Sequence, residues 1–305
     1  MNDLIETASQ RVAIFHPGRV VLAVAQDKMS LQGLILGKNL GLIEPVLIGQ
    51  KNEIADLLEK LGQKVSQWKI IDEHDHIVAT QKAVKLILNG KADILMRGKL
   101  LARDFFTVLF DPSLGLKKNG ELWSNIVVLE IEGIPRLILL TDCALIVEAD
   151  LNRRLQVIQN ATEFAQFLGI KEPKVALLAA VETVTPGMPV SLEEAIIAKM
   201  SERGQFPPGV QVDGPLSLDL SLSPEAVEKK KIKSTVAGYA DILVTNNIHV
   251  GNVLFKSLIT LCGAKSASVV VGAPFPIILT SRSESPENII NSLALSILMR
   301  NENLA

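Results

Sequence analysis

The sequence predicts an α/β fold with mostly parallel sheets covered on both faces. The 305-residue chain is 48% hydrophobic but only 4% aromatic, so its core must be aliphatic, as the cores around parallel sheets usually are. Short β-branched runs alternate with helix-like segments, and glycines often separate them. The length permits one large or two medium domains.

In the first third of the chain, strand and helix patterns alternate in the order that parallel βαβ units require. The predicted strands are short apolar runs at 19–25, 45–49, 68–71 and 92–96. The predicted helices carry apolar residues on one face and cover 29–40, 52–61 and 75–89.

The middle of the chain interrupts this order. Two apolar runs, 125–131 and 136–140, flank Glu132-Gly133-Ile134-Pro135, which predicts an antiparallel hairpin. A second βαβ series then has helices at 151–168, 191–203, 224–230 and 250–261, and strands at 174–180, 210–212, 240–245 and 268–271. A last strand, 276–279, and a last helix follow. We expect a first domain of 1–145 plus 276–305 and a second of 146–275.

Charge and composition exclude several classes of function. The net charge of −2 and the pI of about 6.1 argue against a nucleic-acid or anionic-membrane partner. Cys143 and Cys262 are the only cysteines, so no disulfide framework is expected and a cytoplasmic setting fits. The N-terminus lacks a signal-peptide pattern, and no apolar run reaches membrane-spanning length. Metal-ligand spacings, dinucleotide fingerprints and phosphate loops are absent from the sequence, so we expect no metal and no redox cofactor.

The stretch 277–288 joins an apolar strand to a helix through a polar loop. Ser285 is a good N-cap and Pro286 suits the first helical position. Free N–H groups at a helix N-terminus attract anions, and Thr280 and Arg282 would add donors suited to phosphate. The alternative is a surface junction whose hydroxyls only cap the helix.

Two further strand ends carry polar residues. Arg97-Gly98-Lys99 follows the strand at 92–96, where α/β sheets collect their ligands, although a solvated basic turn would look the same. Gly251 would let a backbone approach a ligand closely. Asn252 and Lys256 would share one face of the helix at 250–261. An enclosed anion site of this composition favours group transfer on a phosphorylated small molecule.

The chain resembles the phosphate acetyl/butyryl transferase family and is most similar to its phosphate butyryltransferase branch. The matching stretches keep the family order and cover most of the chain from about residue 90 onward. They lie at 92–98, 140–144, 173–182, 200–205, 212–219, 234–243, 251–258 and 279–283.

The resemblance implies a two-domain fold like that of isocitrate and isopropylmalate dehydrogenases, with an interdomain cleft. The implied reaction is reversible: acyl-CoA and phosphate give acyl phosphate and CoA. CoA is then a substrate, no cofactor is needed, and the acyl group is butyryl or a similar short or branched one. The implied partners are these small molecules and a second copy of the chain, as a homodimer in the cytoplasm.

The resemblance also implies residue roles. Ser281 and Arg282 match the family's pair that contacts phosphate and CoA. Glu287 matches the carboxylate of the butyryl branch that takes the thiol proton, whereas the acetyl-branch position is Asn288 here. Glu284 is expected to be a solvated charge without a role. The substrate-binding residues are expected to be Thr280, Arg97, Lys256, Asn252, Gly251 and Asp142.

Three alternatives remain open at this point. The enzyme could be a phosphate acetyltransferase. It could be a catalytically silent protein that binds acyl phosphate or CoA, since Asn246 to His249 depart from the family pattern. A metal- and NAD-dependent dehydrogenase on the same fold would need an acidic cluster that the scattered aspartates do not suggest.

Overall fold

The computed structural model describes residues 1–118, 120–280 and 284–300. The chain forms two compact units, which are described separately: unit 1 comprises 1–121 and 265–305, and unit 2 comprises 122–264. These units group the 124–141 hairpin with the second half of the chain and strand 265–271 with the first. The domain limits expected from the sequence, 145/146 and 275/276, stay a prediction.

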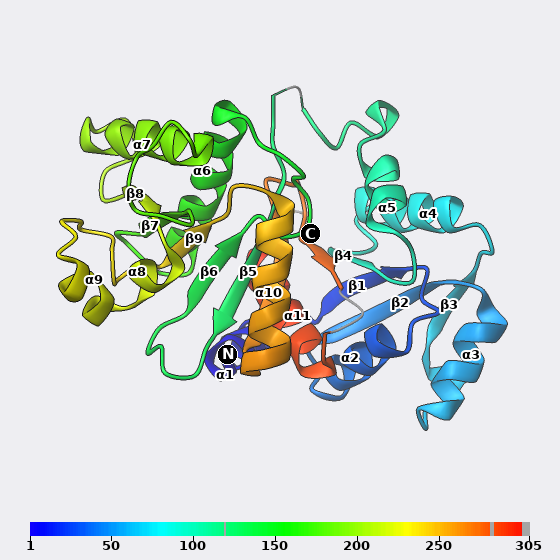
Figure 1. Ribbon diagram of the computed structural model, residues 1–305. Coiled ribbons are helices and arrows are strands. Elements are labelled where there is room, and N and C mark those ends of the chain that lie inside the picture. The colour runs from blue at the N-terminus through cyan, green and yellow to red at the C-terminus, as the bar shows by residue number, and fades with distance from the viewer. Residues whose placement is uncertain (119, 281–283, 301–305) are drawn as a thin grey trace. The chain divides into compact units, whose positions relative to one another are not determined.

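Unit 1 contains a mostly parallel sheet, as predicted (Figure 1). Its strand order is β3-β2-β1-β4-β11-β10. All neighbouring strands are parallel except β10, which runs antiparallel to β11. The strands are β1 (Gly18–Ala23), β2 (Ile43–Gly49), β3 (Lys69–Asp72), β4 (Ile94–Arg97), β10 (Lys265–Val271) and β11 (Ile277–Leu279). The last strand therefore pairs back with the first βαβ series.

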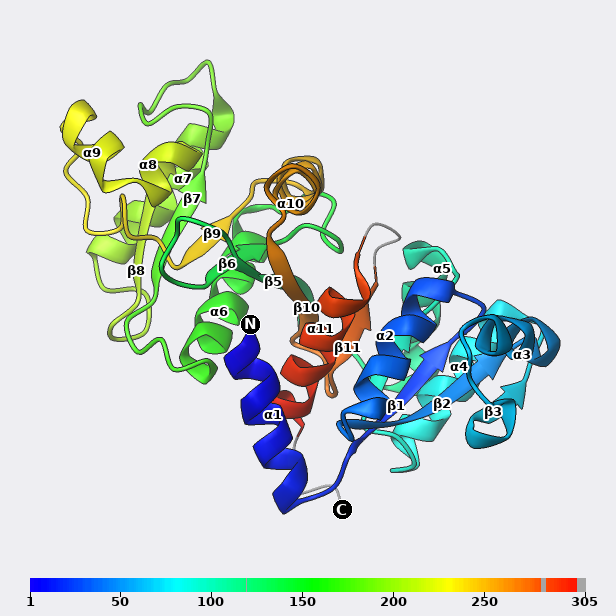
Figure 2. The ribbon, with the colours of Figure 1, turned by 90° about the horizontal axis from the view of Figure 1, so that it is seen from below.

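The helices of unit 1 include two that the sequence patterns did not predict, α1 and α5. The bounds are α1 (Asn2–Ile14), α2 (Lys28–Asn39), α3 (Lys51–Lys60), α4 (His76–Leu88), α5 (Ala102–Leu109) and α11 (Pro286–Met299), with short 3-10 turns at Val65–Gln67 and Pro112–Leu114. Helix α1 buries only Leu4 and Ala8, so its apolar stripe is too narrow to stand out in the sequence. It lies beside α11 in both ribbon views (Figure 2).

The core of unit 1 explains the apolar strands. Val20 and Leu22 of β1 face one core together with residues of α2, α3 and α11, while Val21 between them is equally buried. Successive strand residues point to opposite faces, so the sheet is covered on both sides.

Helix α11 is held against β10 by polar side chains as well as apolar ones. Asn288 Oδ1 accepts a hydrogen bond from the Ser266 N–H at 3.0 Å, and Ser292 Oγ accepts one from the Ser268 N–H at 2.9 Å. Buried donors need such partners. Because consecutive helix residues are about 100° apart, burying Asn288 turns its neighbour Glu287 outward, and Glu287 is exposed. The register of this helix therefore sets where its first-turn carboxylate points.

Unit 2 begins with the predicted hairpin, which is confirmed: β5 and β6 are antiparallel. Its strand order is β5-β6-β9-β7-β8, and the pairs after the hairpin are parallel. The strands are β5 (Ser124–Glu130), β6 (Ile138–Thr141), β7 (Lys174–Leu178), β8 (Gln211–Leu216) and β9 (Ile242–Val244). The helices are α6 (Leu151–Phe167), α7 (Pro189–Glu202), α8 (Leu218–Leu222), α9 (Pro224–Lys230) and α10 (Ile248–Cys262).

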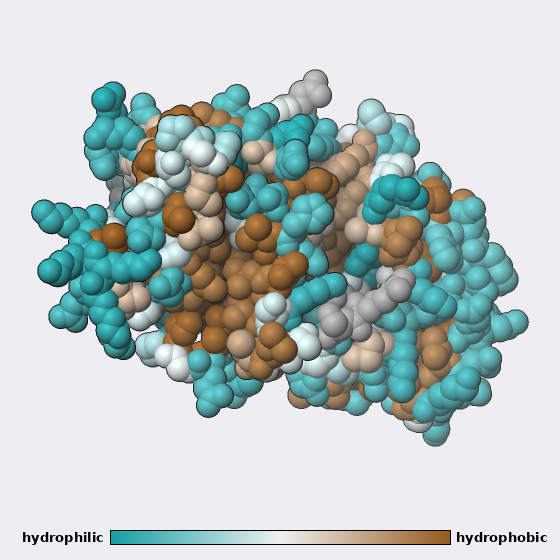
Figure 3. Space-filling model, in the orientation of Figure 1, coloured by the Kyte–Doolittle hydropathy of each residue, from teal (hydrophilic) through white to brown (hydrophobic). Residues whose placement is uncertain are grey.

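Helix α10 has an apolar outer face. Val253 and Leu261 are 65% and 80% exposed, and Figure 3 shows apolar side chains gathered where α10 and the β5–β6 hairpin lie. Within the described ranges, no helix combines the length and apolarity needed to cross a bilayer.

Candidate active site

In unit 1, Arg97 and Thr280 meet at the carboxyl ends of two neighbouring strands. Strand β11 pairs with β4 so that Leu279 lies opposite Arg97. The Thr280 hydroxyl donates to the Arg97 carbonyl at 2.8 Å, and the Arg97 guanidinium donates to the Thr280 carbonyl. Arg97 also donates to the Leu100 carbonyl at 3.2 Å. These bonds fix the point where the chain leaves β11.

The adjoining end of β1 is strained. Val24 has φ of 58°, a left-handed conformation that is a real outlier for a β-branched residue. Its carbonyl accepts the Lys99 N–H at 2.8 Å. A Cβ at Gly98 would lie only 2.2 Å from that carbonyl oxygen, so only glycine fits there. The sequence predicts none of this strain, because valine at this position suggests an ordinary extended strand.

The last helix begins as predicted, but the carboxylate of Glu284, just before it, is buried. Ser285 caps α11 by accepting the Asn288 N–H at 3.2 Å, and Pro286 occupies the first helical position. Glu284 is 3% exposed, so the expectation that it is a solvated charge is wrong: the chain turns it inward just before the cap. Ser281 and Arg282 lie outside the described residues, and their roles stay predictions.

In unit 2, the carboxylate of Asp142 organises the loop that follows β6. Its Oδ1 accepts the N–H groups of Ala144 and Leu145 at 2.8 and 2.7 Å, and its Oδ2 accepts the Asn125 N–H at 2.6 Å. Burial raises the pKa of Asp142, while these N–H groups favour its ionised form. The carboxylate therefore has a structural task, and a contact with substrate stays a prediction.

The start of α10 packs directly on this loop. A Cβ at Gly251 would lie 2.2 Å from the Asp142 carbonyl oxygen. The Asn252 amide donates to the Cys143 carbonyl at 3.1 Å. The protein's own backbone therefore requires glycine at this position, and the approach of Gly251 to a ligand stays a prediction. Lys256, one turn further along, is exposed, and no ion pair is seen for it among the described residues.

The structure therefore assembles two groups of the expected site residues. Arg97, Thr280 and the exposed Glu287 belong to unit 1, whereas Asp142, Gly251, Asn252 and Lys256 belong to unit 2. The first group offers the Arg97 guanidinium, a cation that suits an anion. In the described parts of the chain, no three His, Cys, Asp or Glu side chains gather as metal ligands.

Comparison with known proteins identifies the family. Residues 76–297 match the family described as phosphate acetyl/butaryl transferase. The chain is 38% identical to a phosphate butyryltransferase of Clostridium acetobutylicum, over 92% of this chain and 93% of that protein. It is 37% identical to a phosphate acetyltransferase of Thermotoga maritima, over 91% of this chain and 94% of that protein.

A solved structure agrees with the sequence relatives. The branched-chain phosphotransacylase of Enterococcus faecalis V583 matches with a TM-score of 0.80 and 31% identity, over 93% of this chain and all of that one. The profile match, the relatives and the shared fold lead to one conclusion: the chain belongs to the phosphate acetyl/butyryl transferase family of acyl-transferring enzymes.

Proposed function

We propose that the protein transfers a short acyl group, butyryl or a similar branched one, between CoA and phosphate. The observation that carries this proposal is the Arg97–Thr280 pair, which fixes the chain directly before Ser281 and Arg282, the residues that the resemblance assigns to phosphate. The identities to butyryl- and acetyltransferases, 38% and 37%, are too close to choose between acyl groups. Acetyl transfer is therefore the second candidate.

The reaction requires a thiolate. A free thiol has a pKa of about 8.5 and attacks poorly in its neutral form. In the direction of acyl-CoA synthesis, a carboxylate takes the thiol proton. The sulfur then bonds to the acyl carbonyl carbon, and the carbon–oxygen bond to phosphate breaks with its electron pair leaving on phosphate. No covalent enzyme intermediate is needed.

Cations and hydroxyls stabilise the departing phosphate in this scheme. Ser281 and Arg282 would hold it, Arg97 would add a second cation, and Thr280 would anchor Arg97. Lys256 of unit 2 stays a proposed substrate contact. Preorganised donors aimed at a developing charge often contribute most to catalysis. Neutralising Arg282 should therefore lower kcat by about 10²-fold or more. Near-normal phosphate-dependent turnover by Arg282→Ala would overturn this assignment.

Glu287 is the proposed base. It is exposed in the first turn of α11, where the buried Asn288 holds the helix in register. Replacing it with glutamine should lower kcat by about 10²- to 10⁴-fold. Glu284 is the matched control, since it is a second carboxylate three residues away and is buried. A larger kcat loss in Glu284→Gln than in Glu287→Gln would transfer the role of base to Glu284.

A direct assay separates the candidate functions. Release of CoA thiol from acetyl-, propionyl-, butyryl- and branched acyl-CoA, with phosphate present, should be fastest for butyryl or branched substrates. A preference for acetyl-CoA would favour the acetyltransferase. Absence of thiol release with all four, together with measurable CoA binding, would favour a non-catalytic binding protein. Activity that requires a metal and nicotinamide would instead indicate a dehydrogenase.

The homodimer and the cytoplasmic setting belong to the same proposal. The exposed apolar face of α10, with Val253 and Leu261 outermost, supports a dimer because apolar surface of this kind favours association. Light scattering should give twice the chain mass of 33.1 kDa for the wild type. The double variant Val253→Glu/Leu261→Glu should shift toward the monomer mass if α10 forms the contact. Cell fractionation tests the location.

A further inference from the structure

Unit 1 contains a large pocket at the amino ends of strands β1, β4 and β11, whereas the residues proposed for phosphate binding follow the carboxyl ends of β4 and β11. Its volume is about 740 Å³, within the range of sites for small organic molecules. Arg19 lies at the start of β1, Asp93 directly precedes β4, and Pro276 directly precedes β11. Arg97 and Thr280 stand at the other ends of β4 and β11. The pocket therefore lies away from the unit 1 residues proposed for acyl transfer.

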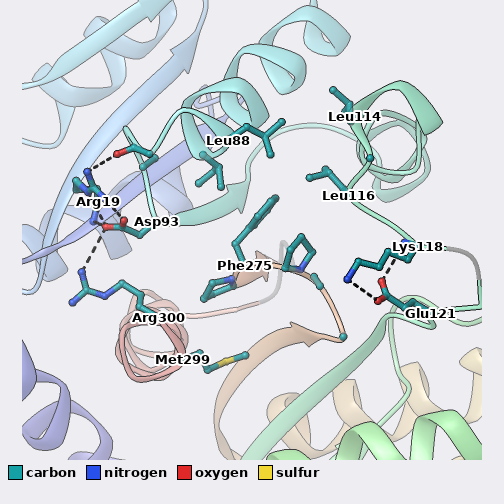
Figure 4. Close-up of a pocket in the computed structure, with 18 residues that line it drawn as sticks. Arg19, Leu88, Asp93, Leu114, Leu116, Lys118, Glu121, Phe275, Met299 and Arg300 are labelled. Atoms are coloured by element: carbon teal, nitrogen blue, oxygen red, sulfur yellow. Dashed lines mark hydrogen bonds and ion pairs between the residues drawn. The ribbon is translucent and has the colours of Figure 1, made fainter. Parts of the chain in front are cut away.

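The middle of the pocket is apolar. Figure 4 shows Phe275 and Leu88 beside Leu114 and Leu116, with Met299 below them. These residues come from four separate segments of the chain, and Phe275 offers a half-buried aromatic ring. Such a lining suits a flat or branched apolar body.

One end of the pocket has excess positive charge. Arg19 donates to Asp93 through Nε at 2.9 Å and through Nη2, and it donates to the Gly90 carbonyl through Nη1 at 2.7 Å. Arg300 lies 3.6 Å from the same carboxylate, so two guanidinium groups share one carboxylate (Figure 4). Burial raises the pKa of Asp93, but hydrogen bonds from Arg19 outweigh it and keep the pKa below its usual value. The group is thus ionised at neutral pH. Glu44 also acts on Arg19, and Arg11 acts on Arg300. Three arginines therefore meet two carboxylates, and the cluster keeps a net charge of about +1.

The two arginines differ in what they can offer a ligand. The Arg300 side chain is 8% exposed, and its guanidinium donates hydrogen bonds to the carbonyls of His16 and Pro17. The Arg19 side chain is 32% exposed, and its guanidinium still has N–H groups beyond the three contacts above. At the far end, Lys118 and Glu121 lie 3.9 Å apart and neutralise each other. Arg19 is therefore the cation that can receive an anion.

From the pocket's size, apolar middle and single cationic end, we infer that it binds a small organic anion with an aromatic or branched apolar body, at a site separate from acyl transfer. The carboxylate, sulfonate or phosphate of the ligand pairs with Arg19. Its apolar body lies between Phe275 and Leu88.

The probe for this site is 2-naphthoate, with neutral 2-naphthamide as its matched control. Isothermal titration calorimetry of the full chain, with saturating CoA and phosphate present, should show one saturable site for naphthoate and weaker binding of the amide. Arg19→Met should weaken naphthoate binding about tenfold or more while leaving the amide unchanged, because a hydrogen bond to a charged group is lost.

A second pair of variants does not depend on the Arg19–Asp93 cluster. Leu88 is 51% exposed at the end of α4, and Leu40 is 57% exposed outside the pocket. Leu88→Trp should block naphthoate binding, whereas Leu40→Trp should bind like the wild type. The inference is overturned if wild type shows no saturable binding at millimolar naphthoate, if CoA and phosphate displace the probe, or if both tryptophan variants bind alike. None of these results bears on acyl transfer itself.

Discussion

Glu194 should make the protein lose stability as pH rises toward 8. The residue lies on α7 with 0% exposure and meets Arg154 of α6 at 3.4 Å. Its Oε2 has no hydrogen-bond partner among the described residues. Burial raises the pKa of Glu194 to about 8, although the charge and hydrogen bond of Arg154 act to lower it. The ordinary value in the unfolded chain is 4.5.

The direction and size of the effect follow from these two values. At pH values between 4.5 and about 8, Glu194 is protonated in the folded state and ionised in the unfolded state. The stability that Glu194 contributes is therefore fully present below its pKa in the unfolded chain and is lost as pH rises toward its pKa in the folded protein. The slope is about 1.4 kcal/mol per pH unit. From pH 5.5 to 7.5 the loss sums to about 2.5 kcal/mol, because the slope flattens near 8.

Urea unfolding of the wild type and of Glu194→Gln at several pH values measures this effect. The variant cannot titrate at this position, so the free energy of unfolding of the wild type should fall relative to it by the amount above. Glu193→Gln is the control, since Glu193 contacts the same arginine at 3.1 Å but is 47% exposed. Equal pH dependence in wild type and Glu194→Gln would refute the reasoning.

Three other substitutions test the supports of the proposed site. Asn288→Ala removes the acceptor of the buried Ser266 N–H and should cost about 1–3 kcal/mol in urea unfolding, whereas the same change at exposed Glu287 should cost under about 0.5 kcal/mol. Gly251→Ala places a methyl group 2.2 Å from the Asp142 carbonyl oxygen. Thermal unfolding should therefore show that the free energy of unfolding falls by about 1–3 kcal/mol. An unchanged unfolding midpoint would contradict the packing described. Thr280→Val removes the hydrogen bond to the Arg97 carbonyl and should raise the KM for phosphate. Thr280→Ser keeps the hydroxyl and should keep the wild-type KM. Equal KM values in both variants would argue against an anchoring role.

Much of the architecture could be predicted from local patterns. Apolar runs of strand length, helical spacing and the Glu132–Pro135 turn led to the parallel order and the hairpin. Ser285 and Pro286 marked the start of the last helix, because capping depends on neighbouring residues alone. The motif stretches indicated the family, since their order along the chain is a property of sequence. Helix α1 was missed, because two buried residues leave too weak a periodic signal.

Only the tertiary structure decided which distant residues meet. Thr280 reaches Arg97 across 183 residues of chain, which requires β11 to insert beside β4. Gly251 must be glycine because the backbone at Asp142 packs against it, and its expected contact with a ligand stays a prediction. Glu284 and Glu287 look alike as exposed carboxylates in sequence. The packing of Asn288 onto β10 leaves Glu287 exposed, whereas Glu284 is buried. Short-range propensities determined the elements, while the register of strands and the rotation of helices, which depend on the whole core, determined the site.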